Sequence, residues 1–189
     1  MVDYLKILNK LLLILNLVFG IFFFFFPYRT KWFFMFFIIS IVPAIYFFYI
    51  IERLGLGEKY KFYAISAIWL NHFGELYFYD SWQYYDKVLH FFIPMLLAHI
   101  IFVYLRKNKF PNRFVAFLMV MGIEALFEIW EYIPHTFLGF QMLGVMSNGI
   151  MVMSPITDTI IDLFLGALGT FIFLYFILPI RNKKNEKEM

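Results

Sequence analysis

Histidines and carboxylates recur at helical spacing inside long apolar stretches of this sequence. Four sets have members three or four residues apart: His72/Glu75, Asp86/His90, Glu124/Glu128/Glu131 and Asp158/Asp162. Side chains at this spacing lie along one face of an α-helix. Imidazole with carboxylate is a ligand combination typical of zinc, manganese or iron, whereas carboxylates alone suit magnesium or calcium. The same groups can also perform general acid–base catalysis.

We expect the four sets to converge on one pocket that binds a divalent metal ion: zinc, manganese, iron or magnesium. The predicted metal ligands are Asp86, His90, Glu128, Asp158 and Asp162. Glu131 and His72 are the predicted catalytic residues, because each could move a proton beside the metal. Eight of the 13 acidic residues fall in this region and Lys87 is the one nearby base. Protons or bound cations must therefore neutralise several of the carboxylates.

The elements that hold these residues are expected to lie in a bilayer. The chain is 63% hydrophobic and 15% charged, against about 45–50% and about a quarter in soluble domains. A core of 189 residues could not hide so much apolar surface. The chain has no cysteine, which excludes disulfides and thiolate chemistry. The net charge of +3 comes from short loops between apolar runs, which indicates membrane orientation and no nucleic-acid binding.

Six apolar runs are long enough to approach the roughly 20 residues of a membrane-spanning helix. They are residues 4–26, 32–51, 62–79, 88–105, 114–133 and 155–178. The predicted fold is all-α: one polytopic membrane helical bundle of residues 1–189, with six transmembrane helices and a charged cytoplasmic tail at 179–189. Of the 16 Lys and Arg residues, thirteen fall on the side of the amino terminus. Both termini are therefore expected in the cytoplasm of a multi-pass inner-membrane protein.

With this orientation, the helical rise places His72, Glu128 and Asp162 at a similar depth, roughly 10 Å below the outer surface. The pocket would then open outward. Ser154 and Pro155 are expected to cap the sixth helix as its N-cap and first-turn proline. The external segment 135–154 is either a lid or an ordinary apolar loop.

Several of these residues could instead have structural roles or be solvated. The buried carboxylates could form a structural polar network that ties helices together. Glu75 and Asp80 could be solvated at the interface, His99 could hydrogen-bond between helices, and His135 could be an interfacial loop residue. Small residues near Gly166 and Gly169 are expected to let helices approach closely.

Three motifs carry a resemblance to a known family: Tyr85-Asp86-Lys87-Val88-Leu89-His90-Phe91, Glu128-Ile129-Trp130-Glu131-Tyr132, and Asp158-Thr159-Ile160-Ile161-Asp162 continuing to Gly166-Ala167. Over about residues 71–170 the chain resembles the YjdF-like family of bacterial and archaeal inner-membrane proteins. Asp86-Lys87 with His90 resembles, more distantly, the start of the VanZ-like family, which is associated with glycopeptide resistance. The chain has Met151-Val152-Met153-Ser154-Pro155 where the YjdF-like family has Gln-Gly-Asp-x-Trp. The resemblance supports the pocket without implying a substrate.

The leading functional hypothesis is an envelope enzyme, a metal-assisted hydrolase or transferase that acts on a lipid or lipid-linked headgroup. Its expected partners are membrane lipids. The alternative is a proton- or cation-coupled transporter or channel, since intramembrane carboxylates also mark ion pathways. A transporter needs a polar route to the cytoplasm, but residues 163–178 contain no acid, base or histidine. A scaffold with a structural polar network is the third hypothesis.

Overall fold

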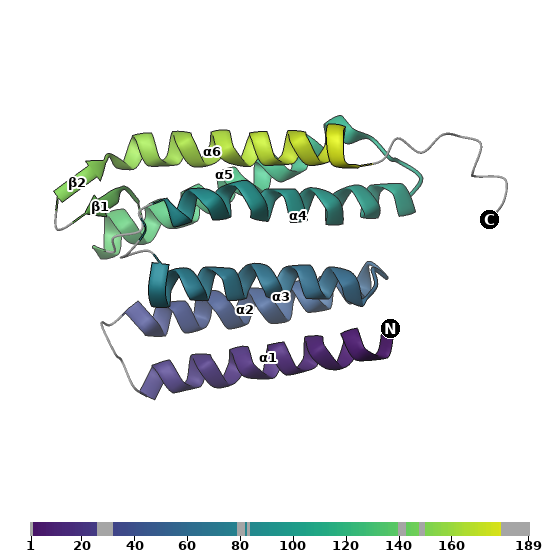
Figure 1. Ribbon diagram of the computed structural model, residues 1–189, viewed down its shortest axis with the longest axis horizontal. Coiled ribbons are helices and arrows are strands. Elements are labelled where there is room, and N and C mark those ends of the chain that lie inside the picture. The colour runs from purple at the N-terminus through teal and green to yellow at the C-terminus, as the bar shows by residue number, and fades with distance from the viewer. Residues whose placement is uncertain are drawn as a thin grey trace.

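Helices dominate the computed structural model, which describes residues 2–25, 32–78, 82, 84–139, 143–147 and 150–178. Within these ranges lie six α-helices: α1 (Val2–Phe25), α2 (Trp32–Arg53), α3 (Glu58–Phe73), α4 (Tyr85–Lys107), α5 (Arg113–Leu138) and α6 (Pro155–Ile172) (Figure 1). Helices α3 and α6 continue into π-helical turns, Gly74–Phe78 and Phe173–Ile177. The expected all-α class is confirmed, and the predicted tail at 179–189 lies outside the described residues.

Three of these helices are long and apolar enough to cross a membrane by length and composition. The spans are Tyr4–Ile21, Tyr85–Lys107 and Pro155–Ile177. Each of the other three predicted runs also coincides with a helix but is not among these candidate spans. Helix α3 has only 16 residues before its π-helical turn, and α5 carries three glutamates in its second half. Length and hydropathy within the described ranges therefore support three spans.

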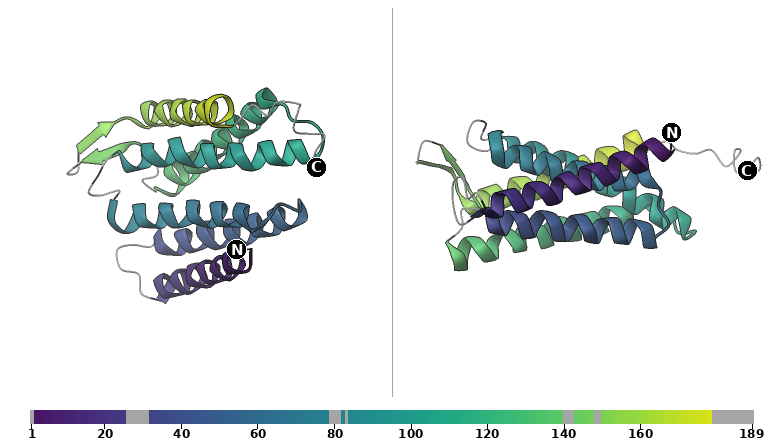
Figure 2. Two further views of the ribbon diagram at one scale, coloured as in Figure 1. Left: turned by 45° about the vertical axis from the view of Figure 1, so that its right-hand side comes forward. Right: turned by 90° about the horizontal axis from the view of Figure 1, so that it is seen from below.

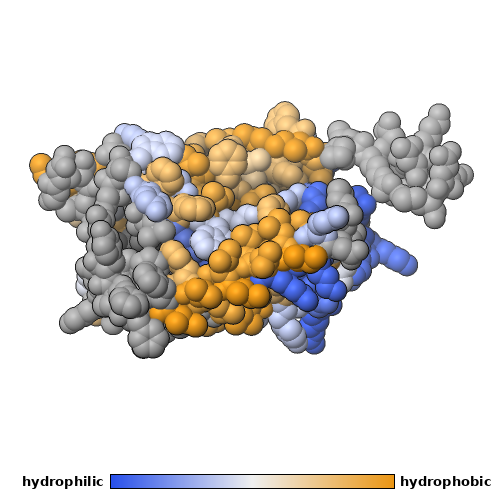
Figure 3. Space-filling model, turned by 60° about the horizontal axis from the view of Figure 1, so that its bottom comes forward, coloured by the Kyte–Doolittle hydropathy of each residue, from blue (hydrophilic) through white to orange (hydrophobic). Residues whose placement is uncertain are grey.

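The helices form two groups of three whose long axes run in similar directions (Figures 1 and 2). Helices α1, α2 and α3 contact one another, as do α4, α5 and α6, and the two groups meet between α3 and α4. A two-stranded antiparallel sheet, β1 (Val145–Ser147) with β2 (Ile150–Met153), lies at one end of the second group. The α4–α5 turn lies at the opposite end. Figure 3 shows apolar surface over the middle of the first group and hydrophilic surface gathered at one end.

Capping residues fix where the site-bearing helices begin and end. The Ser154 side chain accepts a hydrogen bond from the Thr157 backbone N–H at 3.2 Å, and Pro155 occupies the first turn of α6, as expected. Helix α5 continues through Pro134, where the predicted fifth span had ended, and stops at Leu138. Gly139 then adopts a left-handed conformation with φ of 70°, and its N–H bonds the Pro134 carbonyl. This glycine cap ends the helix, because Pro134 removes only one donor from it.

Close packing of α4 on α6 depends on a glycine. A Cβ at Gly169 would overlap the backbone carbonyl of Phe91, so only a glycine allows this approach. Further along, an apolar core of Ala98, Ile101, Phe102, Leu105, Ala116, Val120 and Leu174 fills the space between α4, α5 and the end of α6. The predicted packing role of the small residues in α6 thus has a direct structural basis at Gly169.

Candidate functional site

Lys87 lies among three aspartates where α4 meets α6. Its Nζ donates to Asp162 Oδ2 at 2.6 Å, to Asp86 Oδ2 at 3.1 Å and to Asp158 Oδ1. Lys87, Asp158 and Asp162 are all buried. An ammonium group has three donors, so these three contacts use all of them. The sequence identified Lys87 only as the nearby base, whereas the structure makes it the partner of the whole aspartate set.

His90, one helical turn after Asp86, lies between two sets of carboxylates. Its Nε2 is 3.7 Å from Asp86 Oδ1, on the aspartate side. Its Nδ1 faces α5, at 3.4 Å from Glu124 Oε2 and 3.7 Å from Glu128 Oε1. The ring is buried. Because one ring nitrogen faces each set, His90 lies between the aspartates around Lys87 and the glutamates of α5.

Several carboxylate oxygens in this cluster are buried without a hydrogen-bond donor among the described residues. They are both oxygens of Glu128 and Oδ1 of Asp162. The Thr159 hydroxyl is near enough to interact with Glu128 but lacks hydrogen-bond geometry. A buried acceptor left without a partner costs about 1–3 kcal/mol, and more when charged. The cluster therefore has acceptor capacity that its own side chains do not satisfy.

Two overlapping groups of these side chains could hold a metal ion. Asp86, His90 and Asp162 form one group, and His90, Glu128 and Glu131 form the other. Within each group, one ligand atom from each residue lies within 4.8 Å of the others. Four of the five predicted ligands thus fall in these groups, together with Glu131. Asp158 is absent from both groups.

A glycine of α6 makes room for a glutamate of α5. A Cβ at Gly166 would lie 3.2 Å from Glu124 Oε2. Glu124 is buried and faces His90 Nδ1. The small residue therefore allows α5 to present this carboxylate close to the histidine, a role beyond the general packing function expected of it.

The β1–β2 hairpin and the two residues before it are attached to the cluster by backbone hydrogen bonds. The N–H of Gly144, just before β1, donates to Asp158 Oδ2 at 2.7 Å. The N–H of Leu143 donates to His135 Nδ1 at 3.3 Å. His135, expected in a loop, lies in the last turn of α5. Asp158 therefore has a partner on each oxygen, Lys87 on one and the hairpin on the other.

The structure does not join His72 to these contacts. His72 Nε2 is hydrogen-bonded to Asn16 Oδ1 of α1 at 2.7 Å, and its ring lies beside those of Phe19 and Trp69. His99 packs against the rings of Tyr60, Tyr63 and Phe173. The side chain of Glu75 and all of Asp80 lie outside the described residues.

Lys87 is the residue of the cluster whose contacts sequence reasoning missed. A signal was present, because Asp86 is its neighbour and Asp158 and Asp162 share one helix face. The missing information was the α4–α6 approach at Gly169, which brings those aspartates within reach of the ammonium group.

A second polar network lies at the start of α3, outside the predicted third span. Asn9 Nδ2 donates to the Glu58 backbone carbonyl at 2.8 Å and to Glu58 Oε2 at 2.9 Å. Lys61 pairs with Glu58 Oε1 at 2.9 Å and also with Glu52. Burial raises the pKa of Glu58, but the hydrogen bonds from Lys61 and Asn9 outweigh it and lower that pKa below its usual value.

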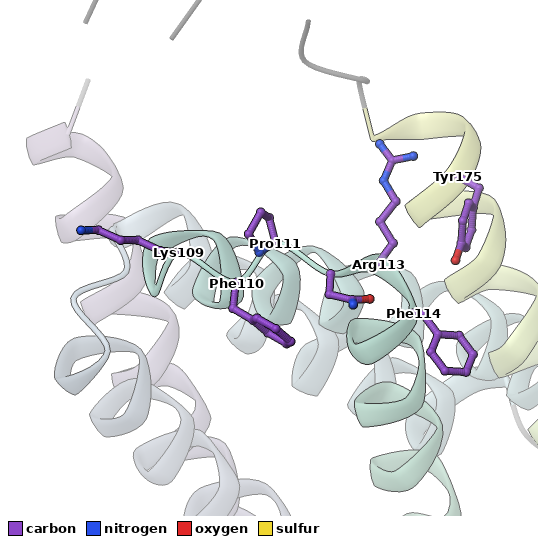
Figure 4. A pocket seen from close by; sticks show the side chains of 7 residues that line it. Lys109, Phe110, Pro111, Arg113, Phe114 and Tyr175 are labelled. Atoms are coloured by element: carbon purple, nitrogen blue, oxygen red, sulfur yellow. The ribbon is translucent and has the colours of Figure 1, made fainter. Parts of the chain in front are cut away.

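A pocket of about 520 Å³ lies at the α4–α5 turn. Its lining residues are Lys109, Phe110, Pro111, Asn112, Arg113, Phe114 and Tyr175 (Figure 4). Arg113 donates to the Leu178 carbonyl at 3.3 Å and lies over the Tyr175 ring. None of the cluster residues lines this pocket, so it is separate from the candidate site.

The fold and the cluster define a helical membrane protein with a buried group of histidine, aspartate and glutamate side chains. The chain belongs to the family described as "Predicted membrane protein (DUF2238)", whose model matches residues 8–183. This match confirms the expected membrane class. No curated protein and no solved structure matches the chain.

Proposed function

We propose that this protein binds a divalent cation in an outward-facing pocket of a six-span inner-membrane bundle and acts there on a lipid or lipid-linked headgroup. The observation that carries the proposal is the Glu128 carboxylate, which is buried beside His90 with no hydrogen-bond donor among the described residues. A cation would satisfy both of its oxygens. Membrane lipids are the proposed partners.

The charge distribution of the structure supports the proposed topology. Arg106, Lys107, Lys109 and Arg113 cluster around the α4–α5 turn, at the end of the bundle opposite the hairpin. Basic residues concentrate on the cytoplasmic side of membrane proteins. The hairpin, Asp86 and Asp158 would then lie toward the outer surface, with both termini in the cytoplasm.

We favour an enzyme over a transporter because the buried polar residues do not extend from the cluster toward the proposed cytoplasmic end of the bundle. Beyond Glu124, the interior between α4, α5 and α6 is the apolar core that contains Ala98, Val120 and Leu174. Of the residues described there, Thr170 is buried and polar, and its hydroxyl has no partner. A cation leaving the cluster toward the cytoplasm would meet no carboxylate on this path.

A cation held by these residues would supply Lewis-acid polarisation of a phosphoryl or acyl oxygen of the headgroup. Glu131 would accept a proton from the attacking hydroxyl or water and return it to the oxygen that leaves as the ester bond breaks. Lys87 holds Asp158 and Asp162 in place through its ion pairs. His72, bonded to Asn16, has no part in this mechanism.

The YjdF-like assignment also remains a proposal. It is supported by motif order over residues 71–170, a region inside the stretch matched by the family model. We propose a more distant relation to the VanZ-like family on Asp86-Lys87 with His90.

The topology can be tested by introducing cysteines, because the chain has none of its own. Ile150→Cys, exposed in the hairpin, should react with a membrane-impermeant thiol reagent in intact cells. Lys109→Cys, exposed at the α4–α5 turn, should react only after permeabilisation. The reverse pattern would contradict the proposed orientation.

The function can be tested in proteoliposomes that contain labelled phospholipids and lipid-linked carriers. We expect headgroup release that needs added Mn²⁺ or Zn²⁺, stops with chelator and is lost in Glu131→Gln. Cation flux above that of empty liposomes, without headgroup release, would contradict the enzyme proposal and favour a transporter.

A further inference from the structure

The candidate metal-binding groups differ in how many of their oxygens are already occupied. On the aspartate side, the Lys87 ammonium bonds Asp86 Oδ2, Asp158 Oδ1 and Asp162 Oδ2. The second Asp158 oxygen accepts from Gly144 N–H. Of the six carboxylate oxygens in this set, four therefore have donors. A fixed positive charge also already stands where a second cation would bind.

The glutamate side has no such occupant among the described residues. Both Glu128 oxygens lack donors although only 5% of the residue surface is exposed. Glu131 and His90 each place a ligand atom within 4.8 Å of a Glu128 oxygen. His90 Nδ1, at 3.7 Å from Glu128 Oε1, faces this side. The two unfilled Glu128 oxygens and the imidazole thus lie together, whereas the unfilled Asp162 Oδ1 belongs to a carboxylate that already accepts from Lys87.

We infer that one divalent transition-metal ion binds to His90, Glu128 and one oxygen of Glu131, and that the other Glu131 oxygen stays available to accept a proton. Lys87 acts as a built-in cation that keeps the aspartate side free of metal. The inference rests on the proposed cation binding and specifies its position, number and class. Imidazole with two carboxylates suits zinc, manganese or iron, whereas magnesium and calcium prefer oxygen alone.

The arrangement is therefore a two-cation site in which one cation is a side chain. Enzymes with two metal ions place them about 3.5–4 Å apart to stabilise both the attacking and the leaving oxygen. Here the Lys87 ammonium, paired with Asp162, would supply the second positive charge from a side chain. Removing it leaves three carboxylates, Asp86, Asp158 and Asp162, free to bind an ion of their own.

The test is equilibrium dialysis of detergent-purified protein against Mn²⁺, with elemental analysis of the bound metal. Wild type should hold one ion per chain. Glu128→Gln/Glu131→Gln should weaken binding by about 100-fold or more, while Asp86→Asn and the exposed control Glu52→Gln should keep the ion. Lys87→Met should bind two ions. Each variant must first elute as a monodisperse, folded species.

The outcomes separate this inference from the proposed function. A wild type that binds no Mn²⁺ or Zn²⁺ would overturn both. Metal that is retained in Glu128→Gln/Glu131→Gln but lost in Asp86→Asn would overturn the assigned position and leave cation binding intact. A folded Lys87→Met that still binds one ion would overturn the role of Lys87, and if this variant does not fold, the comparison of the glutamate and aspartate variants still decides the position.

Discussion

The two halves of the molecule both bury polar side chains between helices, but they satisfy them differently. Between α1 and α3, neutral and charged groups pair: Asn16 with His72, and Asn9 and Lys61 with Glu58. The Asn9 amide oxygen is the one buried side-chain atom there, among the described residues, that lacks a partner. Between α4, α5 and α6, six carboxylates share one lysine and one histidine.

This difference separates polar groups that hold helices together from polar groups that are available to bind a ligand. A fully paired network stabilises a helix contact without further partners. A network with unpaired buried carboxylate oxygens carries a desolvation penalty that a bound ligand can remove. The paired Glu58 carboxylate of the first half is therefore explained by structure alone, whereas the unpaired carboxylate oxygens of the second half support the proposed cation site.

The largest expected effect on stability comes from removing Lys87. Lys87→Met leaves Asp158 and Asp162 buried without their cation, which costs about 3–5 kcal/mol in the metal-free protein. Denaturant unfolding in detergent measures this loss. Asp158→Asn/Asp162→Asn in the same background should recover most of it, and an unchanged stability of Lys87→Met would show that these ion pairs do not hold α4 to α6.

Metal should stabilise the second half through binding. At a free Mn²⁺ concentration 100 times its dissociation constant, the free energy of unfolding should rise by about 2.7 kcal/mol. A thermal melt with and without metal measures the shift. Glu128→Gln/Glu131→Gln should show none, and an equal shift in that variant would place the metal elsewhere.

Gly169→Ala should destabilise the α4–α6 contact by about 1–3 kcal/mol, because the added Cβ meets the Phe91 backbone. Gly122→Ala is the matched control, since nothing lies within 4 Å of its added Cβ. It should be neutral or stabilising by up to about 1 kcal/mol. Equal melting temperatures for the two variants would contradict the claim that the α4–α6 contact requires a glycine at position 169.

In the first half, Asn16→Leu should cost about 1–3 kcal/mol because His72 loses its buried partner. Bound metal should stay at the wild-type level. Replacing both residues, as Asn16→Leu/His72→Phe, should recover part of the stability. A loss of metal in Asn16→Leu would show that the two halves are not independent.

The smallest effect is the pH dependence at Glu58. Its pKa is lower in the folded protein than its usual value of 4.5, so its contribution to stability is full above that value. The contribution is lost as pH falls below 4.5 toward the folded pKa, and it should not exceed about 1 kcal/mol. Glu58→Gln should flatten this part of the curve of stability against pH, and an unchanged acid limb would assign it to other groups.

The sequence was sufficient to predict the helices and most of the cluster, because apolar runs and three- or four-residue spacing are local properties. Spacing within each helix, together with depth, predicted that Asp86, His90, Glu128, Glu131 and Asp162 converge, but the same reasoning also included His72. The role of Lys87 and the separation of His72 depend on which helices touch, and spacing within one helix does not contain that information. The continuation of α5 past Pro134 to the cap at Gly139 was not predicted, because the proline was taken as the end of the helix although it removes only one backbone donor.

The most direct test of the central claim is a structure determined after soaking with Mn²⁺, with anomalous scattering recorded at the manganese edge. One anomalous peak is expected, between His90, Glu128 and Glu131, with the Lys87 ammonium still bound to its aspartates. A peak between Asp86 and Asp162 with Lys87 displaced, or no peak in the α4–α6 group, would contradict it.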